Sequence, residues 1–253
     1  MTSPFMSNTA YLTGRSLRHI ARSPDTIMTT TIMPIAFMLL FVYVFGGSIK
    51  TGPERYVDYL LPGIMLITVA SSVSYTAFRL FLDLKSGIVE RLQSMPIARS
   101  AILWAHVLTS LVATLVSLIV VTLIALIMGF RSGAGFLAWL AVAGILVLFT
   151  LALTWFAVIA GLTAKSPDGA VAFSYPLVFL PFISSAFVLT ATMPGPVRAF
   201  AQHQPVTAIV NTIRSFYLQR PVAPDIWVAL AWCAICLTIS YSLAMAVYKR
   251  KFA

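Results

Sequence analysis

Six long apolar runs separated by short polar segments dominate the sequence. They cover residues 26–45, 59–78, 102–128, 136–163, 170–189 and 226–248. Each run is close to or longer than the ~20 residues that a helix needs to cross a hydrocarbon core of about 30 Å. None shows the alternation of apolar and polar positions that is typical of a barrel strand. The pattern predicts an all-α integral membrane protein with six transmembrane helices, forming a single transmembrane domain over residues 1–253.

The composition agrees with a chain whose main partner is the lipid bilayer. Hydrophobic residues make up 60% of the chain and charged residues only 9%, whereas a soluble domain has about a quarter of its residues charged. The formal net charge is +10. The basic residues are divided among short loops instead of being gathered on one domain, so we expect no nucleic-acid partner.

The distribution of basic residues predicts the orientation in the membrane. Six spans put both termini on one side. That side holds eleven lysines and arginines, against six on the other. Because positive residues favour the cytoplasmic side, both termini are predicted to be cytoplasmic. The first run is long enough to remain as a span, so we expect no cleaved signal peptide.

Residues 8–23 are predicted to form an amphipathic helix that lies at the membrane surface. Arg15, Arg18, His19 and Arg22 fall on one face at helical spacing, with apolar residues opposite. A basic face suits anionic lipid headgroups. The residues leave two interpretations open, a simple membrane anchor and a docking surface for a protein.

The stretch DLKSGIVERLQSMPIARS, residues 83–100, carries five formal charges between the second and third spans. Leu84, Ile88, Leu92 and Met95 recur at helical spacing, and Pro96 would stop a helix there. The pattern is typical of a short cytoplasmic helix on which a soluble partner could push. A solvated loop whose charges keep it out of the bilayer is the alternative.

Residues 196–218, between the fifth and sixth apolar runs, are too polar to cross the membrane, yet they contain apolar residues at helical spacing. Pro205 suits the first position of a helix. A helix of this length reaches only about 20 Å. We expect a re-entrant or interfacial helical hairpin on the external side, just before the last span.

Several predicted spans contain small residues or prolines. Ser110, Ala113 and Ser117 in one run, and Ala157 with Gly161 in another, are typical of close helix contacts. The prolines at positions 34, 176 and 181 are interpreted as helix kinks.

No catalytic or cofactor motif is found in the sequence. All seven acidic residues lie in predicted loops or at the ends of spans, and the three histidines are in separate segments. The phosphate-binding pattern GxxxxGK[ST], the HExxH pair and the GxSxG elbow are all absent. We predict no catalysis, metal or cofactor in this chain. A membrane enzyme that uses loop acids such as Asp83, Glu90 and Asp168, and a purely structural scaffold, are the less favoured alternatives.

The run GIVERLQSMPIARS, residues 87–100, resembles the segment between the second and third spans of ABC type-2 transporter permeases, in particular the drug exporters. Their pattern G-x-x-E-R-L-R-x-x-P-x-x-R departs from this sequence only at Gln93. The similarity continues through the prolines at 176 and 181, Met193-Pro194, the run 204–207 and Arg214. It therefore extends over nearly the whole chain.

The resemblance implies the transmembrane permease subunit of an ATP-driven exporter in a bacterial plasma membrane. In that family two six-span subunits, identical or different, pair, and each rests on a separate ATP-binding subunit that holds ATP and magnesium. The residues implied in coupling to that subunit are Gly87, Glu90, Arg91, Leu92, Pro96 and Arg99, with Arg15, Arg18 and Arg22 as a second surface.

The resemblance also implies a central path between the two subunits, lined by the second and fifth spans. The aromatic residues placed there are Tyr75, Phe78, Phe173, Tyr175, Phe179 and Phe182. Packing against lipid or neighbouring helices is the alternative role for each of them. A path without charges would favour an apolar or amphipathic small molecule such as a drug, an antibiotic or a lipid-like compound. A lipid-linked glycan is the alternative substrate.

Overall fold

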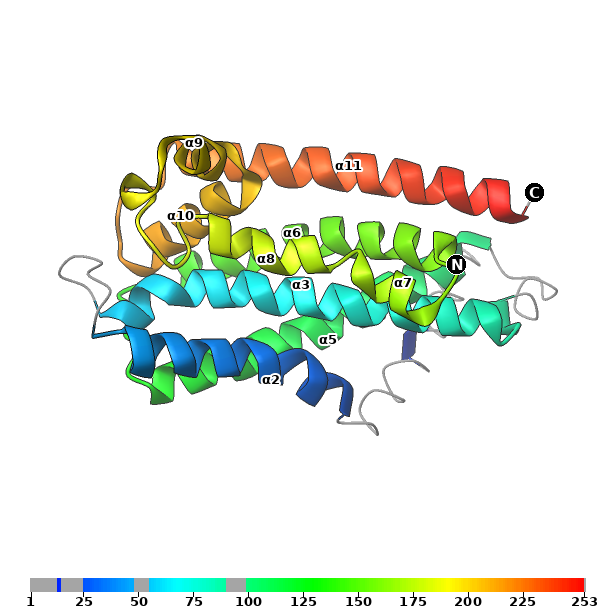
Figure 1. Ribbon diagram of the computed structural model, residues 1–253, viewed down its shortest axis with the longest axis horizontal. Coiled ribbons are helices and arrows are strands. Elements are labelled where there is room, and N and C mark those ends of the chain that lie inside the picture. Colours follow the sequence, from blue (N-terminus) through cyan, green and yellow to red (C-terminus); the bar gives the residue numbers. More distant parts are fainter. Residues whose placement is uncertain (1–12, 15–24, 48–54, 90–98, 253) are drawn as a thin grey trace.

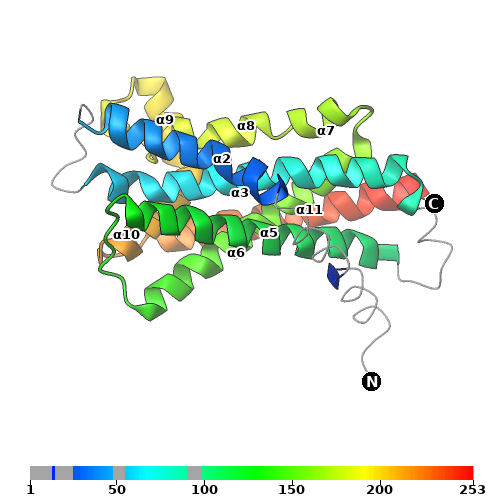
Figure 2. The ribbon, with the colours of Figure 1, turned by 90° about the horizontal axis from the view of Figure 1, so that it is seen from below.

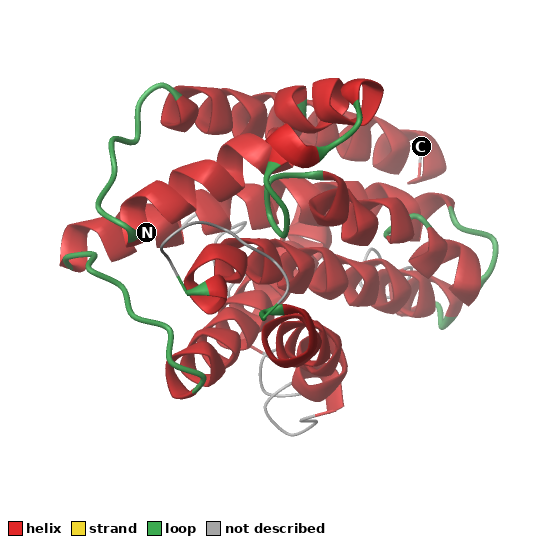
Figure 3. Ribbon diagram, turned by 60° about the vertical axis from the view of Figure 1, so that its left-hand side comes forward, coloured by secondary structure: helices red, strands yellow, loops and turns green. Residues whose placement is uncertain are grey.

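The computed structural model describes residues 13–14, 25–47, 55–89 and 99–252, and over these ranges all regular structure is helical (Figure 3). Four helices are long and apolar enough to cross a membrane. They are α3 (Tyr56–Lys85), α5 (Arg99–Ile127), α6 (Phe136–Thr163) and α11 (Asp225–Phe252). The predicted all-α fold with long membrane helices is therefore confirmed.

Shorter helical elements complete the described chain. They are α2 (Asp25–Leu39) with the π-helical η1 (Leu40–Phe45), α7 (Pro167–Ala172), α8 (Tyr175–Phe179), the 3-10 turns η2 (Leu180–Ile183) and η3 (Thr190–Thr192), α9 (Gly195–His203) and α10 (Pro205–Tyr217). The last two lie at one end of the bundle, whereas α3 and α11 both end at the opposite end (Figure 1). We call these the hairpin end and the C-terminal end.

Helix α3 occupies the centre of the bundle, where it contacts α2, α5, α6 and α10 (Figures 1 and 2). All of its residues from Tyr56 to Ala70 are buried. A helix that is apolar all round buries its whole surface against neighbours, which explains its position. At 1.5 Å per residue it is about 45 Å long, so it extends beyond the hydrocarbon core. It begins before and ends after the predicted span 59–78.

Close contacts between helices form at small residues, as predicted. A Cβ on Gly161 of α6 would lie 2.9 Å from the Ala77 carbonyl oxygen of α3. Ser110 of α5 lies 2.5 Å, oxygen to oxygen, from the Thr76 hydroxyl. Ser117 bonds at 3.2 Å with both Thr30 and Thr31 of α2. These hydroxyl pairs attach α2, α3 and α5 to one another where the surroundings are apolar.

The prediction of one continuous helix over residues 170–189 is wrong. Residues 167–183 form α7, α8 and η2 in succession, followed by an irregular stretch up to Leu189. Pro176 and Pro181 each lie in the first turn of a new helical element, α8 and η2. A proline lacks the backbone donor that continues a helix but suits a first turn, so these prolines break the segment instead of kinking it. Pro34, by contrast, lies inside the continuous helix α2.

Two short helices, α9 and α10, lie where the hairpin before the last span was predicted, and Pro205 is the first residue of α10. The re-entrant or interfacial position of the hairpin on the external side stays a prediction. The apolar face of α10 is buried against α3, α6 and α11. Helix α10 is therefore part of the bundle, whereas α9 is largely exposed beside it.

Candidate functional site

The junction between α3 and α5 at the C-terminal end contains the first described part of the predicted coupling segment. The nitrogen Nε2 of His106 on α5 lies 3.3 Å from Oδ2 of Asp83 on α3. Helix α3 ends at Lys85, and Gly87 follows with a φ of +71°, a conformation that favours glycine. The chain thus leaves α3 at a fixed angle.

Val89 anchors the chain after this turn. Its side chain is only 2% exposed and packs with Ile102 and Ala105 of α5, and with Leu84 of α3. The start of the coupling segment is therefore attached to α5 as well as to α3.

The other residues implied in coupling lie outside the described ranges, apart from Arg99, which begins α5. They are Glu90, Arg91, Leu92, Pro96, Arg15, Arg18 and Arg22. Their contacts with an ATP-binding subunit stay a prediction.

The six aromatic residues predicted to line a path fall into different environments. Tyr75 and Phe78 are half-buried on α3, and Phe173 packs against the main core at the end of α7. Tyr175 and Phe179 are 58% and 63% exposed, one helical turn apart on α8. Together they form one exposed aromatic surface on the outside of α8.

Phe182 belongs to an aromatic stack between η2 and the first apolar helix. Its ring centroid lies 4.9 Å from that of Phe187 and 5.3 Å from that of Phe37 on α2. Phe41 stacks on Phe187 at 4.8 Å. This stack holds the broken segment 175–187 against α2 and η1.

A buried arginine attaches the hairpin to the central helix. Arg214 on α10 is 7% exposed. Its Nη2 donates to the carbonyl oxygens of Ser185 at 2.8 Å and Tyr59 at 2.9 Å, and its Nε donates to the Tyr59 carbonyl at 3.1 Å. The guanidinium also lies 3.7 Å from the centre of the Tyr59 ring. One side chain thus connects α10, α3 and the end of the broken fifth segment.

A polar cavity of about 320 Å³ adjoins this arginine at the hairpin end. It is lined by Tyr59, Ser185, Leu189, Thr190, Asn211, Arg214, Ser215, Arg220 and Asp225. A cavity of this size with several polar groups is suited to water or a polar ligand.

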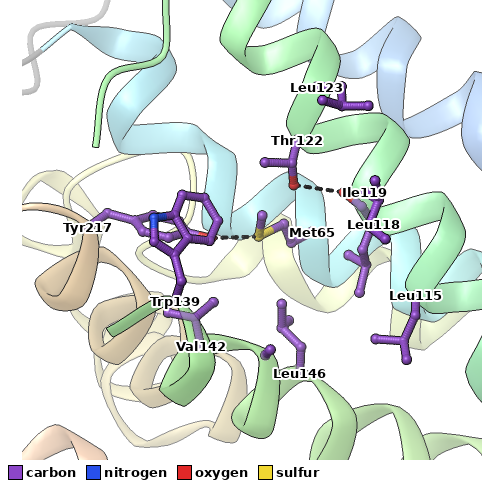
Figure 4. A pocket seen from close by; sticks show the side chains of 11 residues that line it. Met65, Leu115, Leu118, Ile119, Thr122, Leu123, Trp139, Val142, Leu146 and Tyr217 are labelled. Atoms are coloured by element: carbon purple, nitrogen blue, oxygen red, sulfur yellow. Dashed lines mark hydrogen bonds between the residues drawn. The ribbon is translucent and has the colours of Figure 1, made fainter. Parts of the chain in front are cut away.

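An apolar pocket of about 330 Å³ lies between α3, α5, α6 and α10 (Figure 4). Its lining residues are Met65, Leu115, Leu118, Ile119, Thr122, Leu123, Trp139, Val142, Ala143, Leu146 and Tyr217. Figure 4 shows Tyr217 and Trp139 side by side at one end of the pocket, where the Tyr217 hydroxyl donates to the Met65 sulfur at 3.4 Å. Burial raises the pKa of the Tyr217 phenol, which therefore stays neutral.

The part of the chain that the structure describes has histidine, cysteine and acidic side chains on several different helices. No group of three histidine, cysteine or acidic side chains is placed to hold an ion there. Cys233 and Cys236 are free thiols on α11, and Cys233 packs in the core.

Two features of these sites escaped the sequence analysis. The burial of Arg214 was not predicted, although this residue lies in the apolar stripe of α10 between Val210 and Tyr217, which is a signal of burial. The apolar pocket could not be predicted from the sequence, because its lining residues come from four separate helices.

The chain belongs to the ABC-2 type transporter family, whose model matches residues 7–218. Members of this family are transmembrane permease subunits, which agrees with the apolar helices. The chain is 27% identical over 241 residues to the daunorubicin resistance ABC transporter permease protein DrrB1 of Streptomyces coeruleorubidus, covering 94% of this chain and 84% of that protein.

A second relative is the probable doxorubicin resistance ABC transporter permease protein DrrC of Mycobacterium tuberculosis. It is 27% identical over 250 residues, which cover 97% of this chain and 90% of that protein, in both strain CDC 1551 / Oshkosh and strain H37Rv. The match therefore spans the described helices from end to end.

Proposed function

We propose that this chain is the permease subunit of an ATP-driven exporter that moves an apolar or amphipathic drug out of the cell. ATP would be hydrolysed by a separate ABC ATP-binding subunit, and a second permease subunit would complete the path. The names of the relatives, which refer to daunorubicin and doxorubicin resistance, favour a drug over a lipid-linked glycan.

The observation that carries the proposal is the path of α3 from one end of the bundle to the other. At the C-terminal end α3 pairs with α5 through Asp83 and His106. At the hairpin end its Tyr59 carbonyl receives two bonds from Arg214. A force applied beyond Val89 would therefore reach the hairpin through one rigid helix.

The proposed topology has six crossings with both termini in the cytoplasm. The first crossing is α2 with η1, Asp25 to Phe45, which together reach about 30 Å. The fifth is the broken segment from α7 through Leu189. This orientation puts the coupling segment beside the ATP-binding subunit and the hairpin on the external side, consistent with the excess of basic residues near the termini.

The proposed path lies where the second subunit would meet the exposed aromatic surface of Tyr175 and Phe179. Aromatic rings offer a large contact area for a flat, apolar ligand. Tyr75 and Phe78 on α3 and Phe173 at the end of α7 would extend this surface toward the C-terminal end, and Phe182 would support it from behind.

Co-purification tests the proposal. The chain is expressed with a candidate ABC ATP-binding protein from the same organism, as wild type and as a Glu90→Lys, Arg91→Glu double variant. We expect the ATP-binding protein to accompany the wild type and to be lost from the double variant, because both polar contacts reverse their charge. Arg198→Glu on α9, at the opposite end of the bundle, is the control and should retain the partner.

The proposal fails if no ATP-binding protein is retained by the wild type. If the double variant retains it as well as the wild type does, the coupling segment is not the docking surface, whatever the transported molecule is.

A further inference from the structure

The apolar pocket between α5 and α6 opens at the outer surface of the helix bundle. Ile119 and Leu123, which line it, are 58% and 54% exposed. The two helices separate toward the loop 128–135 that joins them (Figure 2). In a membrane the mouth of this pocket faces hydrocarbon, so its occupant enters from the bilayer.

The lining is almost entirely apolar and offers few polar partners to a water molecule. Its hydroxyl protons are already donated within the protein, from Thr122 to the Leu118 carbonyl at 2.7 Å and from Tyr217 to the Met65 sulfur at 3.4 Å. A buried water needs two to four polar partners, and an apolar cavity stays dry. A drug with several polar groups would leave those groups unpaired at the same cost.

The depth of the pocket fits one leaflet. From Leu115 to Leu123 it extends about 12 Å along α5, within the ~15 Å that is half of a hydrocarbon core. Leu123 on α5 and Trp139 on α6 lie within about a turn of the connecting loop. A chain inserted here would have its polar end at that loop.

One cation lies on this loop and a second lies beside it, at the start of α3. Arg131 is exposed, and its Nη1 donates to the Phe130 carbonyl at 3.1 Å. Arg55 at the start of α3 donates to the Gly129 carbonyl at 2.8 Å. The carboxylate of Asp58 accepts from the Arg131 backbone N–H at 3.0 Å. Two cations beside one carboxylate leave a positive charge that favours an anionic headgroup.

We propose that this pocket binds an acyl chain of an anionic phospholipid, whose headgroup lies beside Arg131 and Arg55. The chain would contact Met65 of α3 and Tyr217 of α10, and would fill the space between these helices and the α5–α6 pair. The lipid would thereby hold the hairpin end together. This site is separate from the aromatic surface proposed for the exported drug.

Fluorescence quenching by brominated lipid tests the site, because Trp139 lines it. The protein is reconstituted with phosphatidylglycerol or phosphatidylcholine that carry the same dibrominated chains. The signal of Trp139 is the difference between the wild type and Trp139→Phe, since the chain has five tryptophans.

We expect half-maximal quenching of Trp139 at a roughly fivefold lower mole fraction of brominated phosphatidylglycerol than of phosphatidylcholine. This ratio corresponds to about 1 kcal/mol from one arginine at the membrane surface. Arg131→Gln should abolish the preference. Ala143→Phe, which fills the mouth, should weaken quenching by both lipids, whereas Ala234→Phe on the exposed face of α11 should not.

The proposal is overturned if Trp139 quenching follows the mole fraction of brominated lipid equally for both headgroups, as contact with bulk lipid does. It is also overturned if tetraphenylphosphonium, an amphipathic cation, displaces the brominated lipid, because the pocket would then be a drug site. The headgroup comparison needs the wild-type chain and Trp139→Phe, and it needs no transport activity. Its result is therefore independent of whether the other variants fold and of whether the chain exports drugs.

Discussion

Replacing Arg214 by alanine removes the side chain that holds α10 against α3 and against the segment after η2. The two shortest bonds, from Nη2 to the Ser185 and Tyr59 carbonyls, are 2.8 and 2.9 Å long. A hydrogen bond to a charged group contributes about 1.5–3 kcal/mol. The Ser185 carbonyl keeps the Tyr59 hydroxyl as a donor, so the penalty of an unpaired acceptor is small there.

Taking the lower value for each of the two bonds, we expect Arg214→Ala to lower the free energy of unfolding by about 3 kcal/mol. For a chain of this size each kcal/mol corresponds to roughly 2–4 °C in melting temperature, so Arg214→Ala should melt roughly 6–12 °C below the wild type. Arg214→Lys keeps the charge but not the planar fork that reaches several carbonyls, and should fall between the two. Thermal unfolding in detergent, followed by tryptophan fluorescence, measures the difference.

Arg198→Ala is the matched control, because Arg198 is exposed on the neighbouring helix α9. Its stability should change by no more than about 0.5 kcal/mol. If Arg214→Ala has the same melting temperature as the wild type and Arg198→Ala, Arg214 does not hold the hairpin against α3. The proposed mechanical link from α3 to α10 would then be wrong.

Three further substitutions test the packing and the junction. Gly161→Leu should separate α6 from α3 and cost about 1–3 kcal/mol, whereas Gly144→Leu, where nothing lies within 4 Å, should be tolerated; equal melting temperatures would contradict the close contact. Gly63→Ala places a Cβ 2.6 Å from that of Ala186 and should lower the melting temperature, and an unchanged one would show that the segment 184–187 can move away freely. Asp83→Asn should change stability by less than about 1 kcal/mol while lowering the drug transported per ATP hydrolysed, and unchanged coupling would show that the pair with His106 is not part of the link.

The long helices were predictable because their pattern is a property of each segment alone. Residues 136–163 coincide with α6, since an uninterrupted apolar run bounded by glycine and lysine has only one way to satisfy its backbone in a membrane. The hairpin was predictable for a related reason, because Pro205 and the apolar spacing after it define a helix too short to cross.

The break in the fifth segment could not be predicted, because a proline can either lie within a helix or start a new one. Pro34 and Pro176 are both surrounded by apolar residues, yet the first lies within a helix and the second starts one. Neighbouring helices decide this by satisfying the freed carbonyls, and the sequence of one segment does not contain that information.

The sites were predictable only where one segment carries them. Gly87 marks the end of α3 through its own conformational preference. The Asp83–His106 pair, the Arg214 bonds and the apolar pocket each join residues from different helices. Such sites appear only when the helices are packed together.

The most direct test of the central claim is drug transport in inside-out vesicles that contain this chain and its ABC ATP-binding partner. Doxorubicin should accumulate in the vesicles when ATP is added, and should not when either chain is omitted or a non-hydrolysable ATP analogue replaces ATP. Accumulation that needs no ATP, or that persists without this chain, would contradict the account of an ATP-driven permease subunit.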